Sequence, residues 1–284
     1  MTESLRCCEA SERAGEEIGA TATVAENWLL VEVPGPWPRD VSEGDGLTPR
    51  ALAAVQDWLA RTPSSRLMFV RRPAGRASSA RPLIFVVRAS EAEAGVRRLE
   101  LGSLDELGGL DLEHAGSASV APLVLVCGHG TRDACCARRG TAVSTALLSH
   151  LAPDELWTSS HHGGHRFAAN VLVLPAGIHL GRVSADEAPS LVGRALTGRV
   201  DLAWYRGRTV YERNVQAAER AVREATGLDG TGDVQLVAVD GDRVLFRSQR
   251  GAHEAWVETV PGPVVPASCG AEPEAQTVFT ARML

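Results

Sequence analysis

The sequence predicts a folded α/β protein made of two unequal halves. Short apolar, β-branched runs alternate with helical patterns along the chain, as expected for a mixed α/β fold. Hydrophobic residues make up 44% of the 284 residues and charged residues 23%, so the chain contains enough apolar material to bury a core. A stretch rich in Gly, Ser and Asp over residues 102–121 is the best candidate for a linker. We therefore expect an N-terminal α/β half over residues 1–115 and a C-terminal half over residues 116–284.

A β-α-β-β-β order is expected in the N-terminal half, after a polar leader. Residues 28–33 (WLLVEV) predict a buried strand, which ends at the prolines of residues 34–38 because proline cannot continue the interior of a sheet. Thr48 and Pro49 resemble a helix cap followed by proline in the first turn, and apolar residues then recur on one face up to about Ala60. Three further strands are predicted over residues 67–71, 83–88 and 96–101.

The C-terminal half is also expected to alternate strands and helices. Residues 123–126 are all apolar, which is typical of a buried strand, and a polar loop is predicted over residues 127–136. A helix is expected over residues 141–151, ended by Pro153. The later predicted elements are strands at 171–174 and 178–183, helices at 186–196 and 210–225 with Gly227 as the cap of the second, and a hairpin-rich set over 234–260.

Charge and hydropathy exclude two classes of partner. Arginine supplies all 29 positive side chains against 35 acidic ones, giving a net charge of −6. A chain this acidic offers no general field for phosphate groups, so nucleic-acid binding is not expected. No apolar run approaches the roughly 18 to 20 residues that span a bilayer, and the polar N-terminal region lacks the apolar core of a signal peptide. We expect a cytoplasmic protein that does not bind membranes.

The cysteines do not form the pattern of a disulfide framework. They are Cys7, Cys8, Cys127, Cys135, Cys136 and Cys269. Without a secretory signal, free thiols, redox thiols or metal ligands are expected instead. Only the middle three have the local density of a metal site, and the outer three are expected to be packed or exposed free thiols.

Two segments carry the candidate ligands: CGHGTRDACC over residues 127–136 and SSHHGGH over residues 159–165. Thiolates and imidazoles bind borderline and soft metals, and two of each close a tetrahedral site. Cysteines of structural zinc sites usually stand two to four residues apart, whereas eight residues separate Cys127 from Cys136. That wider loop favours a binuclear iron–sulfur cluster over a zinc ion, with the Rieske centres as precedent for histidine ligands. Gly163 and Gly164 would let the backbone approach such a group closely.

Polar neighbours of these segments are expected to support the site rather than bind the metal. His129 is expected either to donate a hydrogen bond behind a ligand or to lie at the surface. Arg132, Asp133 and Arg166 are expected to anchor the loops by ion pairing. His162 is expected to point away from the site.

These two segments, extended to CGHGTRDACCA and SSHHGGHRFAANVLVLPAGIHLGRV, resemble the sucrase/ferredoxin-like family of thioredoxin-like ferredoxins with C-x8-C and H-x-G-G-H motifs. The leader RCCEASERAGEEIGATA, the segment WLLVEVPGPWPRD and the late PASCG are also similar to features of that family. The resemblance implies a thioredoxin-like ferredoxin domain in the C-terminal half. It further implies a [2Fe-2S] cluster bound by Cys127 and Cys136 on one iron and by His161 and His165 on the other. Cys135 competes with Cys136 as a ligand, and the family's spacing favours Cys136.

The expected function is that of a one-electron carrier that serves an unidentified redox partner protein, rather than that of a stand-alone enzyme. One alternative is a thiol–disulfide oxidoreductase using Cys135 and Cys136, or Cys127 and Cys136, although the missing C-x-x-C motif argues against it. The other alternative is an interaction module stabilised by one zinc ion. Glycoside hydrolysis is not expected, because the sequence identifies no suitable pair of carboxylates. Neither the electron donor nor the oligomeric state follows from the sequence.

Overall fold

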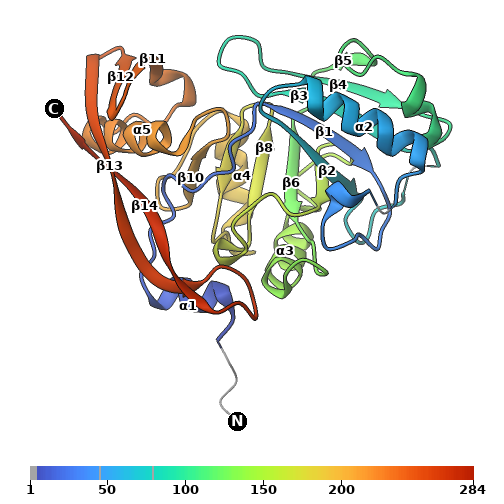
Figure 1. Cartoon of the computed structure of the whole chain (residues 1–284), viewed down its shortest axis with the longest axis horizontal. Coiled ribbons are helices and arrows are strands. Elements are labelled where there is room, and N and C mark those ends of the chain that lie inside the picture. The colour runs from blue at the N-terminus through green and yellow to red at the C-terminus, as the bar shows by residue number, and fades with distance from the viewer. Residues whose placement is uncertain (1–4, 45, 79) are drawn as a thin grey trace.

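The chain forms a mixed α/β structure with one large curled sheet and one smaller antiparallel sheet (Figure 1). The computed structural model describes residues 5–44, 46–78 and 80–284. The large sheet has ten strands in the order β10-β9-β8-β6-β7-β2-β1-β3-β4-β5. The small sheet has the order β11-β12-β13-β14 and lies at one side of the molecule.

The elements of the N-terminal half follow the predicted order closely. They are α1 (Cys7–Arg13), β1 (Asn27–Glu32), η1 (Val41–Glu43), α2 (Pro49–Arg61), β2 (Ser65–Arg71), β3 (Leu83–Arg88), β4 (Gly95–Glu100) and η2 (Leu104–Gly109). The start of α2 is confirmed: Thr48 precedes it and its Oγ1 accepts a hydrogen bond from the Ala51 N–H at 3.3 Å. Helix α1 was missed, because its seven residues lie within the polar leader.

The elements of the C-terminal half complete the large sheet and form the small one. They are β5 (Ser117–Ser119), β6 (Leu123–Cys127), α3 (Ala134–Leu147), β7 (Leu156–Ser159), η3 (His165–Phe167), β8 (Val171–Leu174), β9 (Ile178–Leu180), α4 (Ala188–Leu196), β10 (Tyr205–Arg208), α5 (Arg213–Thr226), η4 (Thr231–Asp233), β11 (Gln235–Asp240), β12 (Arg243–Ser248), β13 (Gly251–Pro266) and β14 (Pro273–Met283). The predicted cap of α5 is confirmed, since Gly227 adopts the left-handed conformation there.

The helix predicted over residues 141–151 is wrong in its bounds, because α3 begins at Ala134 and ends at Leu147. The carboxylate of Asp133 caps this earlier start by accepting a hydrogen bond from the Cys135 N–H at 2.8 Å. The second part of the predicted polar loop is therefore the first turn of a helix. Cys135 and Cys136 are held by helical backbone at neighbouring positions, rather than by a flexible loop.

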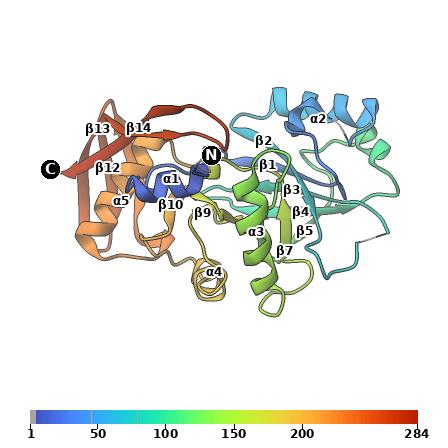
Figure 2. The ribbon, with the colours of Figure 1, turned by 90° about the horizontal axis from the view of Figure 1, so that it is seen from below.

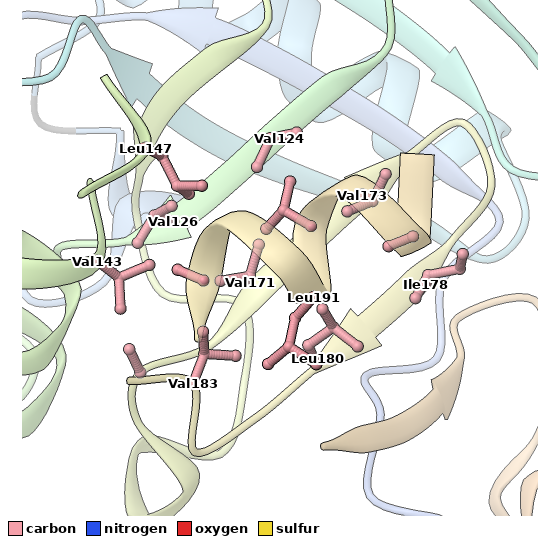
Figure 3. Close-up of a cluster of buried hydrophobic side chains, with 14 of the residues drawn as sticks. Val124, Val126, Val143, Leu147, Val171, Val173, Ile178, Leu180, Val183 and Leu191 are labelled. Carbon is pink, nitrogen blue, oxygen red and sulfur yellow. The ribbon is translucent and has the colours of Figure 1, made fainter. Parts of the chain in front are cut away.

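Buried clusters on the faces of the large sheet hold the helices in place. On one face, Val124 and Val171 of the sheet pack with Val143 of α3 and Leu191 of α4 (Figure 3). On another, α2 packs against β1 and β2 through a separate cluster that includes Trp58. Because each helix buries one apolar face against strands, the orientation of α3 relative to β6 is fixed by the core.

The two halves of the chain share the large sheet. Strand β2 pairs with β7 through Val70 opposite Ser159 and Arg71 opposite Thr158. A further cluster combines side chains of both halves, among them Trp28, Phe85, Trp157 and Leu172. The boundary expected between residues 115 and 116 stays a prediction.

The N-terminal helix and the C-terminal ribbon meet beside the start of α3. Helix α1 contacts both β13 and η3, and Figure 2 shows α1 beside the long β13–β14 ribbon. Segments from the beginning, middle and end of the chain are thus brought to one place. Among the described residues, no helix is both long and apolar enough to cross a lipid bilayer.

Candidate metal centre

Three of the four predicted ligands form a compact group. The Nδ1 atom of His161 lies 3.8 Å from the Sγ atom of Cys127 and 3.9 Å from that of Cys136. These three donor atoms all lie within 4.8 Å of one another. The His165 ring stacks on that of His161, with ring centroids 4.0 Å apart and 20° between their planes, but His165 lies outside the close group. The structure therefore places two thiols against a pair of stacked imidazoles.

The sheet brings the two ligand segments side by side. Strand β6 ends at Cys127, which pairs with Ser159 at the end of the parallel strand β7. The chain beyond β7 carries His161, so the histidine segment emerges next to the first thiol. Ligands at the carboxyl ends of neighbouring parallel strands are a common arrangement in α/β proteins.

Helix α3 approaches the end of β6 unusually closely because Gly140 has no side chain. A Cβ atom at this position would lie 2.0 Å from the carbonyl oxygen of Cys127. The helix can therefore rest directly on the strand, and its first turn holds Cys136 beside Cys127. Gly140 was not recognised from the sequence, since a glycine inside a helical pattern gives no sign of what lies against it.

The glycines of the histidine segment serve a purpose other than the one predicted. Gly163 has φ +94° and Gly164 has φ +72°, both in the left-handed region that favours glycine. A Cβ atom on Gly163 would lie 2.2 Å from Thr23 Oγ1, and one on Gly164 would lie 2.4 Å from an Arg206 guanidinium nitrogen. Their absent side chains thus let the loop pack against the protein, where close approach to a metal had been expected.

Arg206 supports this loop from beneath and was missed in the sequence. Its side chain is buried, and Nη1 donates hydrogen bonds to Gly163 O at 2.9 Å and to Asn170 Oδ1 at 2.8 Å. Burial lowers the pKa of Arg206 to about 9. The four-residue strand that carries it, YRGR, has no apolar pattern, so nothing in the sequence marked it as buried.

His129 and His162 both support the site without joining the thiol group. His129 is buried; its Nδ1 accepts a hydrogen bond from the His161 N–H at 3.1 Å, and its Nε2 donates to Pro38 O at 2.8 Å. His129 therefore positions the backbone of a candidate ligand, but it does so as a hydrogen-bond acceptor, where a donor had been expected. His162 points away from the thiols: its Nδ1 lies 2.9 Å from Nε2 of the buried His179.

The charged residues near the motifs anchor the loops. Arg166 forms a salt bridge with the buried Glu16 at 2.8 Å, and Arg132 donates to the carbonyl oxygen of Arg39 at 3.4 Å. Asp133 caps α3. These contacts attach the ligand-bearing segments to the rest of the protein.

Burial sets the protonation of the candidate ligands. It moves the pKa of His161 well below its ordinary range and lowers that of His165 to about 4, so both imidazoles are neutral near pH 7. A hydrogen bond from the Cys136 thiol lowers the pKa of Cys127. Neutral imidazoles and a thiolate are the forms that bind a metal. The Nδ1 atom of His165 is moreover buried without a hydrogen-bond partner.

A cleft of about 300 Å³ opens beside the histidines. His161 and His129 form part of its lining, together with Arg39, Arg66 and Arg132. Both thiols are buried, whereas His161 and His165 are partly exposed. The site therefore has a thiol side that faces the core and a histidine side that faces solvent. Such a buried group of cysteines and histidines can hold a metal ion or a metal cluster.

Cys135 faces away from this group although it is the neighbour of Cys136. Its Sγ atom lies 3.7 Å from that of Cys7 and 3.5 Å from that of Cys269. The outer cysteines, expected to be isolated free thiols, thus gather around Cys135. Sequence reasoning missed this group because Cys7 and Cys269 are each more than a hundred residues from Cys135.

Comparison with protein families identifies the chain, whereas comparisons with curated proteins and with solved structures returned no match. The family model described as Sucrase/ferredoxin-like matches residues 18–207, which is more than half of the chain. The match includes both motifs of the candidate centre, and Cys7, Cys8 and Cys269 lie outside it. The chain, with its buried cysteines and histidines, belongs to the Sucrase/ferredoxin-like family.

Proposed function

We propose that this protein is a one-electron carrier whose [2Fe-2S] cluster is bound by Cys127, Cys136, His161 and His165. The observation that carries the proposal is a buried pair of thiols against two neutral imidazoles, one of which has an orphaned nitrogen. A buried nitrogen without a partner is costly, and a metal bond to His165 Nδ1 would satisfy it. When bound, the cluster would supply reversible one-electron chemistry.

The spread of the four donors supports a group larger than one ion. In a tetrahedral zinc site, a sulfur and a nitrogen ligand lie about 3.5 Å apart, as follows from Zn–S and Zn–N distances of about 2.3 and 2.0 Å. His161 is close to this separation from both thiols and would have to move away from them to bind the second iron, whereas His165 already lies outside the close group. Two thiols on one side and two stacked imidazoles on the other suit paired ligands on two irons. With this cluster we propose a thioredoxin-like ferredoxin domain in the C-terminal half.

The ligand types set the electrochemical behaviour. Two neutral imidazoles in place of thiolates leave less negative charge at the centre, which raises its potential above that of plant-type ferredoxins with four cysteines. His161 turns Nδ1 toward the thiols while its ring lines the cleft. Its Nε2 is therefore the atom able to exchange a proton with the cleft, and the potential should fall as the pH rises.

The histidine side is the place where a partner would exchange electrons. Arg39, Arg66 and Arg132 line the cleft there and give a locally basic surface on an acidic protein. An acidic redox protein of the cytoplasm fits this surface. Nucleic acids and membranes are not expected partners.

The experiment is a measurement of iron, zinc and acid-labile sulfide on protein purified without oxygen, together with visible absorption and with EPR after reduction. About two irons and two sulfides per chain are expected. His161→Ala and His165→Ala should each alter the spectra, while His150→Ala, which changes an exposed histidine beyond the C-terminal end of α3, should not. His165→Cys should retain the cluster and lower its potential, because a thiolate adds negative charge.

A zinc-stabilised interaction module is the second candidate, and the short distances from His161 to both thiols favour it. Colourless protein that holds zinc but no sulfide, and loses that zinc on His161→Ala, would establish this candidate and refute the cluster. Folded, metal-free protein that reduces disulfides would refute both and favour a thiol–disulfide oxidoreductase.

A further inference from the structure

A second group of donor atoms lies on the other side of Cys135. It contains Cys7 of α1, Cys135 of α3, Cys269 beyond the end of β13, and Asp133 at the cap of α3. Cys7 Sγ lies 3.7 Å from Cys135 Sγ and 3.6 Å from Cys269 Sγ, and the latter two atoms are 3.5 Å apart. The two carboxylate oxygens of Asp133 lie 3.8 and 3.7 Å from Cys7 Sγ. All four residues offer a donor atom within 4.8 Å of the others.

These separations match the edges of a tetrahedron around one metal ion. With metal–sulfur distances of about 2.3 Å and metal–oxygen distances of about 2.1 Å, two sulfurs lie about 3.8 Å apart and a sulfur and an oxygen about 3.6 Å apart. In contrast to the first centre, all four donors belong to the close group. An iron–sulfur cluster would hold cysteines on different irons farther apart, because its sulfides lie between them.

Asp133 holds two of the thiol ligands in place. Its Oδ1 accepts the Cys135 N–H and its Oδ2 accepts the Cys269 N–H, both at 2.8 Å. Each oxygen still has a lone pair for a metal. One buried carboxylate therefore joins the start of α3 to the C-terminal ribbon and faces the third thiol, that of Cys7.

Cys8 is close to the group but does not complete it. Its Sγ lies 2.9 Å from that of Cys135, yet Cys8 is not among the four mutually close donors. Cys7 and Cys8 both approach Cys135 Sγ, but only Cys7 also belongs to the close group with Cys269 and Asp133. The chain thus supplies a matched pair of neighbouring buried cysteines, one inside the group and one beside it.

We propose that Cys7, Cys135, Cys269 and Asp133 bind one Zn²⁺ ion in a closed, structural site. Three thiolates and a carboxylate are ligands that zinc takes, and the three buried donors and the half-buried Cys269 leave little room for a substrate. The ion ties α1 and the end of β13 to the first turn of α3. Cys7 and Cys269 lie outside residues 18–207, so the family match does not itself contain the complete site. The site also does not depend on the proposed cluster.

The first test is X-ray absorption at the zinc edge on the full-length protein, purified reduced and without oxygen, then supplied with Zn²⁺. We expect about one tightly bound zinc per chain with three sulfur neighbours at about 2.3 Å and one oxygen at about 2.1 Å. Absence of tightly bound zinc, or nitrogen among its ligands in the Cys127→Ser/Cys136→Ser variant, would overturn the proposal. This variant removes the two thiols of the first centre and should keep the zinc.

The second test compares Cys7→Ser with Cys8→Ser, and adds Cys269→Ser and Asp133→Asn. Cys7→Ser and Cys269→Ser should lower the bound zinc at least about tenfold, Asp133→Asn should weaken zinc binding, and Cys8→Ser should retain it. Retention in Cys7→Ser with loss in Cys8→Ser would contradict the ligand set, as would iron in place of zinc. Iron and sulfide contents are measured in parallel, so a failure of the [2Fe-2S] proposal appears separately. If a variant does not fold, the absorption spectrum of the wild-type protein still decides.

Discussion

Alanine in place of Gly140 should destabilise the protein, although alanine normally favours a helix. Gly140 lies inside α3, where an exposed glycine would cost about 1 kcal/mol relative to alanine. Its Cβ would lie 2.0 Å from the Cys127 carbonyl oxygen, whereas real Cβ atoms essentially never come closer than 3.0 Å. Helix and strand must therefore separate by about 1 Å, and overpacking of this kind costs about 1–3 kcal/mol or more. Because the contact is far inside the normal limit, the upper part of this range is expected, and a net loss of up to about 2 kcal/mol remains after the gain of about 1 kcal/mol in helix propensity.

Gly193 offers a matched control. It also lies inside a helix, α4, but it is exposed and a Cβ there would meet no atom within 4 Å. Gly193→Ala should therefore raise the stability by about 0.5–1 kcal/mol. The two substitutions are chemically identical and are expected to act in opposite directions.

Urea unfolding followed by circular dichroism measures both effects, and the metal content measures the consequence for the site. Separation of α3 from β6 moves Cys136 away from Cys127, so Gly140→Ala should also lower the metal bound at that centre. If Gly140→Ala were as stabilising as Gly193→Ala and left the metal content unchanged, the close contact of α3 with β6 would not position the thiols, and the reasoning would be refuted.

Three further substitutions test the surroundings of the site and one buried carboxylate. Gly164→Ala should lower the free energy of unfolding by about 1–2 kcal/mol through backbone strain, and by more because the new Cβ displaces Arg206. Gly227 has a similar φ but open space around it, so Gly227→Ala should cause the strain alone. Thermal unfolding compares the two variants. Arg206→Lys should destabilise the protein by about 2–4 kcal/mol and reduce metal binding, because lysine lacks the planar, multiply donating guanidinium group. Unchanged stability together with unchanged metal content would contradict this expectation. The carboxylate of Glu32 accepts a hydrogen bond from the Leu83 N–H at 3.0 Å, and burial raises its pKa. Ionised Glu32 therefore lowers the stability of the folded protein at a pH above the raised pKa, and this loss disappears below pH 4.5. Glu32→Gln should thus be more stable than the wild type near pH 7 and lose this advantage as the pH falls toward 4.5, which urea unfolding at several pH values can check.

Local signals explain which elements were predictable. The buried strands are recognisable as runs of β-branched residues. Helix caps such as Thr48 and Gly227 act through their immediate neighbours, so the local sequence is sufficient to predict both kinds of feature. Strands β7 and β10 are four residues long and partly polar, and they are strands only because the sheet pairs them. The start of α3 was placed too late because Ala134–Gly140 lacks a continuous apolar stripe and its cap, Asp133, was assigned to loop anchoring.

Of the two candidate sites, one could be predicted from local sequence and the other could not. The motifs around Cys127 and His161 are dense in the sequence, so their residue types alone indicated a metal. Cys7 lies 128 residues from Cys135, and Cys135 lies 134 residues from Cys269. Such a group depends on tertiary packing, and no spacing rule applies to it. The buried position of Arg206 could not be predicted for a related reason, since the hydrogen-bond partners that allow an arginine to be buried are not local in the sequence.

The pairing of β2 with β7 has a consequence for how a partner would be received. The cleft beside His161 takes Arg39 and Arg66 from one half of the chain and His129 and Arg132 from the other. Directly beneath it the halves are joined by backbone hydrogen bonds, including one from the Ser160 N–H to Phe69 O at 2.7 Å. A hinge motion that opened or closed the cleft would break these hydrogen bonds, so the two walls of the cleft move as one rigid body. A partner that binds at this surface, as proposed above, would therefore dock rigidly onto a preformed shape.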